Sequence, residues 1–89
     1  MEIASMNEFQ DICLDKLIDR YEEITGKRLS KVREEVFIVW AVKALQNYKC
    51  LVSTSVNGDG VYVEYTFNGD KGELYEDFYI KECNNCYRD

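Results

Sequence analysis

Four cysteines are the residues of this 89-residue chain whose type and spacing most suggest chemistry. Cys83 and Cys86 are separated by two asparagines, a spacing that can place two thiolates on one zinc ion. Tetrahedral zinc takes four ligands, and because the chain contains no His, the other two would be Cys13 and Cys50. The sequence therefore suggests one structural zinc ion bound by Cys13, Cys50, Cys83 and Cys86.

The same cysteines have two other interpretations. Free cysteines are among the most buried residue types, so they can simply be inert core thiols. A redox role is less favoured, because no strand precedes the Cys-x-x-Cys motif as it does in thioredoxin-like proteins. The absence of a second Cys-x-x-Cys motif weakens the zinc hypothesis, whereas the small core favours it.

A second candidate feature is a row of carboxylates on the first predicted helix. At 100° per residue, its members share a narrow arc on the side away from the core: Glu8, Asp11, Asp15, Asp19 and Glu22. Like charges four residues apart destabilise a helix, so the row has a cost that binding to an Arg/Lys groove would offset. We expect Asp11, Asp15, Asp19 and Glu22 to contact a partner. The alternative is an ordinary solvated face.

Catalysis is not favoured by the residue inventory. Without His, the chain lacks the Ser-His-Asp and Cys-His arrangements and the commonest general base at neutral pH. No Gly-rich loop precedes a helix in the phosphate-binding pattern. The Gly-containing segments 57–60 and 68–72 lack the ligand spacing of a calcium loop, and we interpret them as turns.

Seventeen acidic residues against eleven basic ones give a formal charge of −6. This charge disfavours nucleic-acid binding, which needs Lys and Arg to displace counterions, and favours basic protein surfaces. The N-terminus has neither the basic start nor the apolar segment of a signal peptide, and no apolar run reaches the length of a membrane span. We therefore expect a cytoplasmic protein, in which disulfides are rare.

These features must be positioned by one small domain covering residues 1–89. A capping box at residues 5–8 and Gly26 predict a helix that ends at about Thr25. Its predicted core side consists of Cys13, Leu14, Leu17, Ile18, Tyr21 and Ile24. The basic cluster of Lys27, Arg28, Lys31 and Arg33 then suggests a tether between the helix and a sheet.

The long apolar run from Val36 to Val56, which contains the only Trp, predicts a central hairpin turning at residues 46–49. Its strands should cover about 36–46 and 50–56, although helical spacing at Val32, Val36 and Trp40 leaves a helix possible. After a turn signal at 57–60, residues 61–67 alternate as a third strand. Residues 73–89 show apolar positions at i,i+4, which predicts a C-terminal helix. The expected fold is α+β: an N-terminal helix, a three-stranded antiparallel sheet and a C-terminal helix.

Residues 39–49 and 51–54, together with the segment 65–71 (YTFNGDK), give the chain a family resemblance. Over about residues 36–82 it resembles small uncharacterised proteins encoded by phages and prophages of Gram-positive bacteria. That resemblance implies that the protein is encoded by a phage or prophage, but it does not point to any particular activity. In size, acidity and mixed helix–sheet order the chain is also similar to phage anti-CRISPR proteins that inhibit type II effectors. The helix–sheet–helix order is similar to double-stranded-RNA-binding domains too, but their basic face is missing.

The resulting hypothesis is a phage-encoded inhibitor that binds a host defence protein, a type II CRISPR effector nuclease, in the host bacterial cytoplasm and blocks DNA binding or cleavage. A guide-loaded nuclease has positively charged channels that an acidic surface can occupy. The alternative is a non-catalytic structural or regulatory phage module, which as a homodimer would pair through an exposed sheet edge.

Overall fold

The computed structural model describes residues 1–29, 32–56 and 58–88. Its elements follow the order α1 (Met6–Thr25), the short 3-10 helix η1 (Val32–Glu35), β1 (Val36–Ala44), β2 (Asn47–Thr54), β3 (Val61–Asn68) and β4 (Glu73–Ile80). Three predicted features include residues outside the described ones: Lys31 of the basic cluster, Asn57 of the second turn and Asp89 of the tail.

Helix α1 has the ends that its sequence predicts. The Ser5 hydroxyl accepts a hydrogen bond from the Glu8 N–H at 3.2 Å, and the Glu8 carboxylate accepts one from the Ala4 N–H at 3.0 Å. At the other end, Gly26 has φ 74°, and its N–H donates to the Glu22 carbonyl at 2.9 Å. Both ends therefore satisfy backbone groups that the helix leaves unpaired. Neither this helix nor any other in the described ranges is long and apolar enough to cross a membrane.

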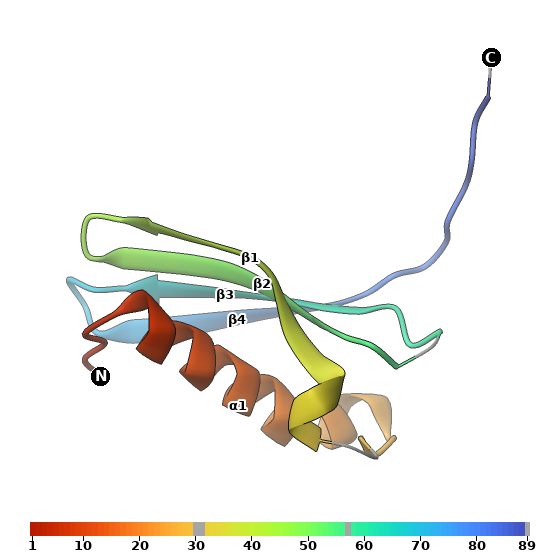
Figure 1. Ribbon diagram of the computed structural model, residues 1–89, viewed down its shortest axis with the longest axis horizontal. Coiled ribbons are helices and arrows are strands. Elements are labelled where there is room, and N and C mark those ends of the chain that lie inside the picture. The colour runs from red at the N-terminus through yellow and green to blue at the C-terminus, as the bar shows by residue number, and fades with distance from the viewer. Residues whose placement is uncertain (30–31, 57, 89) are drawn as a thin grey trace.

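The four strands form one antiparallel sheet in the order β1-β2-β3-β4, so each strand pairs with its neighbour in the chain (Figure 1). The segment 36–44 is extended, which excludes the helical interpretation of this region. The first hairpin turns at Leu45 and Gln46, earlier than predicted, and Leu45 adopts φ 57° there. Strand β2 consequently begins at Asn47. Strand β3 starts at Val61 as predicted and continues one residue further, to Asn68.

The prediction of three strands and a C-terminal helix is wrong. Residues 73–80 form β4, which pairs with β3 along its whole length, from Asn68↔Glu73 to Val61↔Ile80. A spacing of four residues is one helical turn but also two strand repeats, so Leu74 and Phe78 share a face in either structure. The turn at 69–72 brings this segment beside β3, whose free backbone groups then favour a strand. Residues 81–88 form neither helix nor strand.

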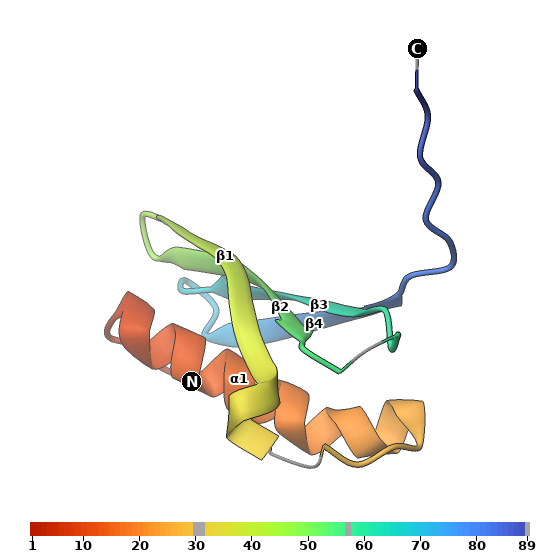
Figure 2. The same ribbon diagram turned by 45° about the vertical axis from the view of Figure 1, so that its right-hand side comes forward.

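The core lies between α1 and one face of the sheet, which gives two layers (Figure 2). Phe9 stacks on Tyr48 with ring centroids 5.2 Å apart, and Tyr48 lies beside Phe67. The fully buried side chains of this interface come from both layers: Phe9, Cys13, Leu17, Tyr21, Cys50, Val52, Val61, Val63 and Tyr65. In both views no described helix or strand covers the other face of the sheet.

Candidate functional site

The four cysteines occupy two separate places. Cys13 of α1 and Cys50 of β2 are both fully buried and lie next to each other across the helix–sheet interface. Interaction with the Cys50 thiol, and then burial, raise the pKa of the Cys13 thiol well above its usual range. Cys83 and Cys86 are exposed on the tail, which projects away from the sheet on the side opposite α1 (Figure 1). The described residues contain no group of three or more metal-ligating side chains, so the predicted four ligands are not brought together.

The acidic row on α1 is partly neutralised by the segment that follows the helix. Arg33 of η1 forms ion pairs with both Asp11, at 2.9 Å from its Nη2, and Asp15, through its Nη1. These three residues together carry one net negative charge. The guanidinium of Arg33 thus connects η1 to the outer side of the helix, which is the tether expected of the basic cluster.

At the end of the row, Glu22 pairs with Arg28 at 3.2 Å, although both side chains are more than half exposed. Asp19 forms no ion pair with any residue that the structure describes. Of the four predicted contact residues, three therefore have a cationic partner within the chain. The net negative charge of the acidic row is thus smaller than the sequence indicates.

The uncovered face of the sheet carries a set of aromatic side chains. Residues that pair directly in antiparallel strands point to the same face, so the strand register shows which residues lie on the uncovered face. One row across the sheet runs Phe37↔Ser53↔Tyr62↔Tyr79, the next Trp40↔Leu51↔Glu64↔Asp77, and a third Val42↔Lys49↔Thr66↔Tyr75. We call this surface the open face.

Large side chains on the open face are substantially exposed: Trp40 is 42% exposed, Tyr75 47% and Tyr79 53%. The charges among them are mainly negative. Lys49 is paired with Glu64 at 3.3 Å, whereas Asp77, on the edge strand β4, has no ion-pair partner among the residues that the structure describes. Glu73 extends the acidic character at the start of β4. The open face is therefore an aromatic surface with a net negative charge.

Sequence reasoning missed the open face for one reason. The predicted fold has Trp40 in the central hairpin and Tyr75 and Tyr79 on a C-terminal helix, so it does not bring these three residues to one surface. The alternation in β4 was the available signal, because Leu74, Glu76 and Phe78 alternate with the tyrosines. The division of β3 into two faces, with Tyr62 and Glu64 away from the core, was predicted and is confirmed.

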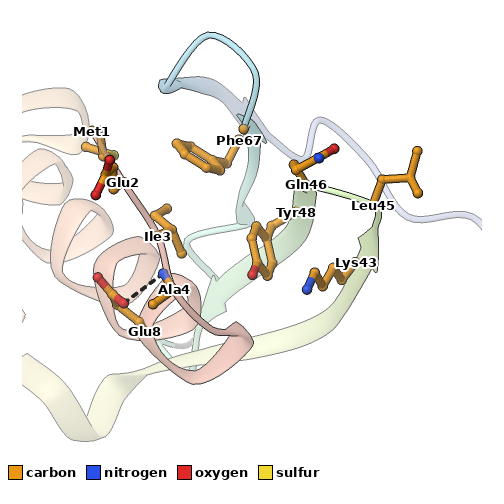
Figure 3. Close-up of a pocket in the computed structure, with 11 residues that line it drawn as sticks. Met1, Glu2, Ile3, Ala4, Glu8, Lys43, Leu45, Gln46, Tyr48 and Phe67 are labelled. Atoms are coloured by element: carbon orange, nitrogen blue, oxygen red, sulfur yellow. Dashed lines mark hydrogen bonds between the residues drawn. The ribbon is translucent and has the colours of Figure 1, made fainter.

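A hollow of about 530 Å³ lies between the N-terminal segment and the first hairpin (Figure 3). Ile3, Tyr48 and Phe67 point into it, and the Lys43 ammonium lies 5.4 Å from the centre of the Tyr48 ring. Glu2 and Glu8 line the same hollow, so the charged side chains around it carry one net negative charge. Its lining contains no Cys, Ser or Thr.

These observations define a class: a two-layer α+β protein in which one helix covers one face of a four-stranded antiparallel meander and the other face is open. The chain belongs to the family of unknown function DUF6275, whose sequence pattern matches residues 10–89. Comparison with curated proteins and with solved structures gave no match. The family match covers α1 from Gln10 onward, all four strands and the tail, but assigns none of them an activity.

Proposed function

We propose that this protein is a non-catalytic protein ligand that acts by binding, through its open face, a partner surface that is apolar at its centre and basic at its rim. The observation that carries the proposal is that the open face exposes Trp40 on edge strand β1 and, on edge strand β4, Tyr75 and Tyr79 on either side of Asp77. Trp and Tyr dominate binding energy at protein interfaces, because they bury a large area at a small cost in side-chain entropy.

The rest of the molecule supports a rigid binding platform. The side of the sheet opposite the open face is packed on α1 by fully buried side chains such as Leu17 and Tyr65. Each row of the open face runs across all four strands, so the aromatic side chains are held in place by backbone hydrogen bonds of the sheet. A preorganised surface loses little conformational entropy on binding.

Charge identifies the partner's chemistry. With a net charge of −6 the chain repels nucleic acid, and the negative open face would also repel a second copy of itself. A protein surface rich in Lys and Arg around an apolar patch complements both features of the open face.

The narrower form of this proposal is an inhibitor encoded by a phage or prophage that binds a type II CRISPR effector nuclease in the host cytoplasm. Its support is the resemblance of residues 36–82, the acidity of the chain and the basic channels of such nucleases. Because Arg33 and Arg28 neutralise much of the row on α1, we place the open face first and Asp19 with its neighbours second as contact surfaces.

The homodimer alternative would use the free edge of β1. The register of β1 shifts between Ile38 and Trp40, where Val39 forms a bulge. Bulges interrupt the regular row of backbone groups and oppose edge-to-edge pairing. The geometry therefore favours a surface-mediated partner over a continuous sheet through this edge.

The test is a titration of the protein against a purified, guide-loaded type II CRISPR effector, with DNA cleavage as the second readout. We expect Trp40→Ala and Tyr79→Ala each to weaken binding at least about tenfold, the size of effect of an interface hot spot. The matched control is Ile24→Ala, an exposed apolar residue on α1 that should leave binding unchanged. Binding should also weaken as salt rises, because the partner is basic.

Three results would count against parts of the proposal. If the protein does not bind the guide-loaded effector, a type II CRISPR effector is not its partner. If Trp40→Ala and Tyr79→Ala both bind with unchanged affinity, the open face is not the contact surface. If only charge reversal at Asp11, Asp15 and Asp19 abolishes binding, the acidic row on α1 is the contact surface instead. Thermal unfolding of each variant separates loss of binding from loss of folding.

A further inference from the structure

The tail presents two cysteines with the spacing of a metal-binding pair and no other role in the fold. Residues 81–88 are exposed and form no helix or strand, so neither Cys83 nor Cys86 packs against the core. Among the residues that the structure describes, the one hydrogen bond to either sulfur is a 3.7 Å contact from the Asn85 side chain to Cys83. Two cysteines separated by two residues can bind one zinc ion with both sulfurs.

The chain supplies only half of a structural zinc site in this arrangement. Zinc in structural sites takes four ligands, and the protein contains no His. The remaining thiols, Cys13 and Cys50, are free, fully buried and adjacent to each other between α1 and β2. To reach the tail they would have to leave the core, which would separate the helix from the sheet.

We propose that the tails of two copies of this chain share one zinc ion, with Cys83 and Cys86 of each copy as its four ligands. On binding, each of the four thiols releases a proton to solvent, four zinc–sulfur bonds form and the water bound to the ion is displaced. The resulting site has a charge of −2. This inference does not rest on the proposed function, because it uses the tail and not the open face.

The position of the tail makes such a link compatible with both folded bodies. It leaves the sheet at Ile80, the end of the edge strand β4, and extends away from α1 and the core (Figures 1 and 2). Two copies joined at Cys83 and Cys86 therefore keep their cores intact. The dimer would present two open faces, so a partner with two matching surfaces would be bound with a higher effective affinity.

The test is native mass spectrometry with zinc quantification on the full chain, supplied with equimolar zinc. We expect a dimer with one zinc per two chains, which a chelator converts to metal-free monomer. The double variant Cys83→Ser/Cys86→Ser should be a folded monomer without zinc. The matched control Asn84→Ala/Asn85→Ala changes the same tail but keeps the ligands, and it should still form the zinc-linked dimer.

Other outcomes would overturn the inference. One zinc per monomer would show that a single chain supplies the whole site and that the ion is not shared between copies. A metal-free monomer at equimolar zinc would show that the tail has no site of useful affinity. A dimer that persists in the Cys83→Ser/Cys86→Ser variant would place the contact between copies elsewhere.

Binding of Co²⁺ in place of zinc reports on the metal ligands independently of mass spectrometry. Tetrahedral cobalt thiolate absorbs in the visible range, and a titration should reach its plateau at half an equivalent of metal per chain. Acidification should release the metal, because protons compete with it for the thiolates. A plateau at one equivalent per chain would contradict the shared site.

Discussion

The thiols of Cys13 of α1 and Cys50 of β2 lie next to each other in the helix–sheet interface, where neither side chain is exposed. This contact divides the four cysteines into a buried pair and an exposed pair. It also holds the Cys13 thiol in its protonated form, because its pKa is raised by the partner thiol and by burial. The buried pair belongs to the core, and the thiols that can react or bind a metal are those of Cys83 and Cys86 in the tail.

The first prediction is selective labelling of the thiols. In the native, metal-free protein a thiol-alkylating reagent should modify Cys83 and Cys86 rapidly and leave Cys13 and Cys50 unmodified, because the thiolate is the reactive form and needs access. Mass spectrometry should show two adducts before denaturation and four after it. Rapid addition of a third or fourth label to the folded protein would contradict the buried pair.

The second prediction concerns alkaline pH. Tyr21 donates a hydrogen bond to Asp59 at 2.9 Å, and burial together with this carboxylate raises the pKa of Tyr21 to about 12. The unfolded chain has a tyrosine pKa of about 10. The stabilisation is therefore complete below pH 10 and is lost as the pH rises through 12, by at most about 1.4 kcal/mol per pH unit.

Urea unfolding between pH 9 and pH 12 measures this effect on the free energy of unfolding. Tyr21→Phe should lower stability by about 1 kcal/mol near neutral pH, because the hydrogen bond is lost, and should flatten part of the alkaline decline. The remaining slope is expected from Tyr65, whose pKa burial and Glu76 also raise. A decline equally steep in the variant would assign the pH dependence to other groups.

The third prediction concerns Arg33 and the acidic row. Arg33→Gln removes both ion pairs and leaves Asp11 and Asp15 to repel each other, so we expect a loss of about 0.5–1 kcal/mol at low salt. The loss should shrink in high salt, since both carboxylates are exposed. Arg28→Gln, which removes only the pair with Glu22, is the control and should have a smaller effect. A large loss that salt does not change would indicate that the Arg33 side chain acts through packing.

The fourth prediction concerns the contact between two turns. The Gly69 N–H donates to the Asn47 side chain at 3.0 Å, and a Cβ at Gly69 would lie 2.1 Å from the Gln46 carbonyl oxygen. Gly69→Ala should therefore destabilise the protein by about 2 kcal/mol or more, because backbone must shift. Gly58→Ala is the control: it has open space and only the strain of φ 79°, which costs about 1 kcal/mol. Equal melting temperatures for the two variants would argue against the close approach of the turns.

Local signals in the sequence were sufficient for several parts of this protein. Ser5, Glu8 and Gly26 act on backbone groups within one turn of themselves, so both ends of α1 were predictable. The alternation of Val61, Val63 and Tyr65 defines two faces of β3 without reference to any other segment. The net charge, the lack of His and the Cys-x-x-Cys spacing are also properties of the sequence alone.

The tertiary structure decided what depends on contacts between distant segments. Whether residues 73–80 form a helix or a strand follows from their pairing with β3, because their apolar spacing suits both. Arg33 reaches Asp11 and Asp15 across 22 and 18 residues of chain, so the neutralisation of the acidic row has no local signal. The pairing of Cys13 with Cys50, and the assembly of Trp40 with Tyr75 and Tyr79 on the open face, likewise require the register of the whole sheet and its packing on α1.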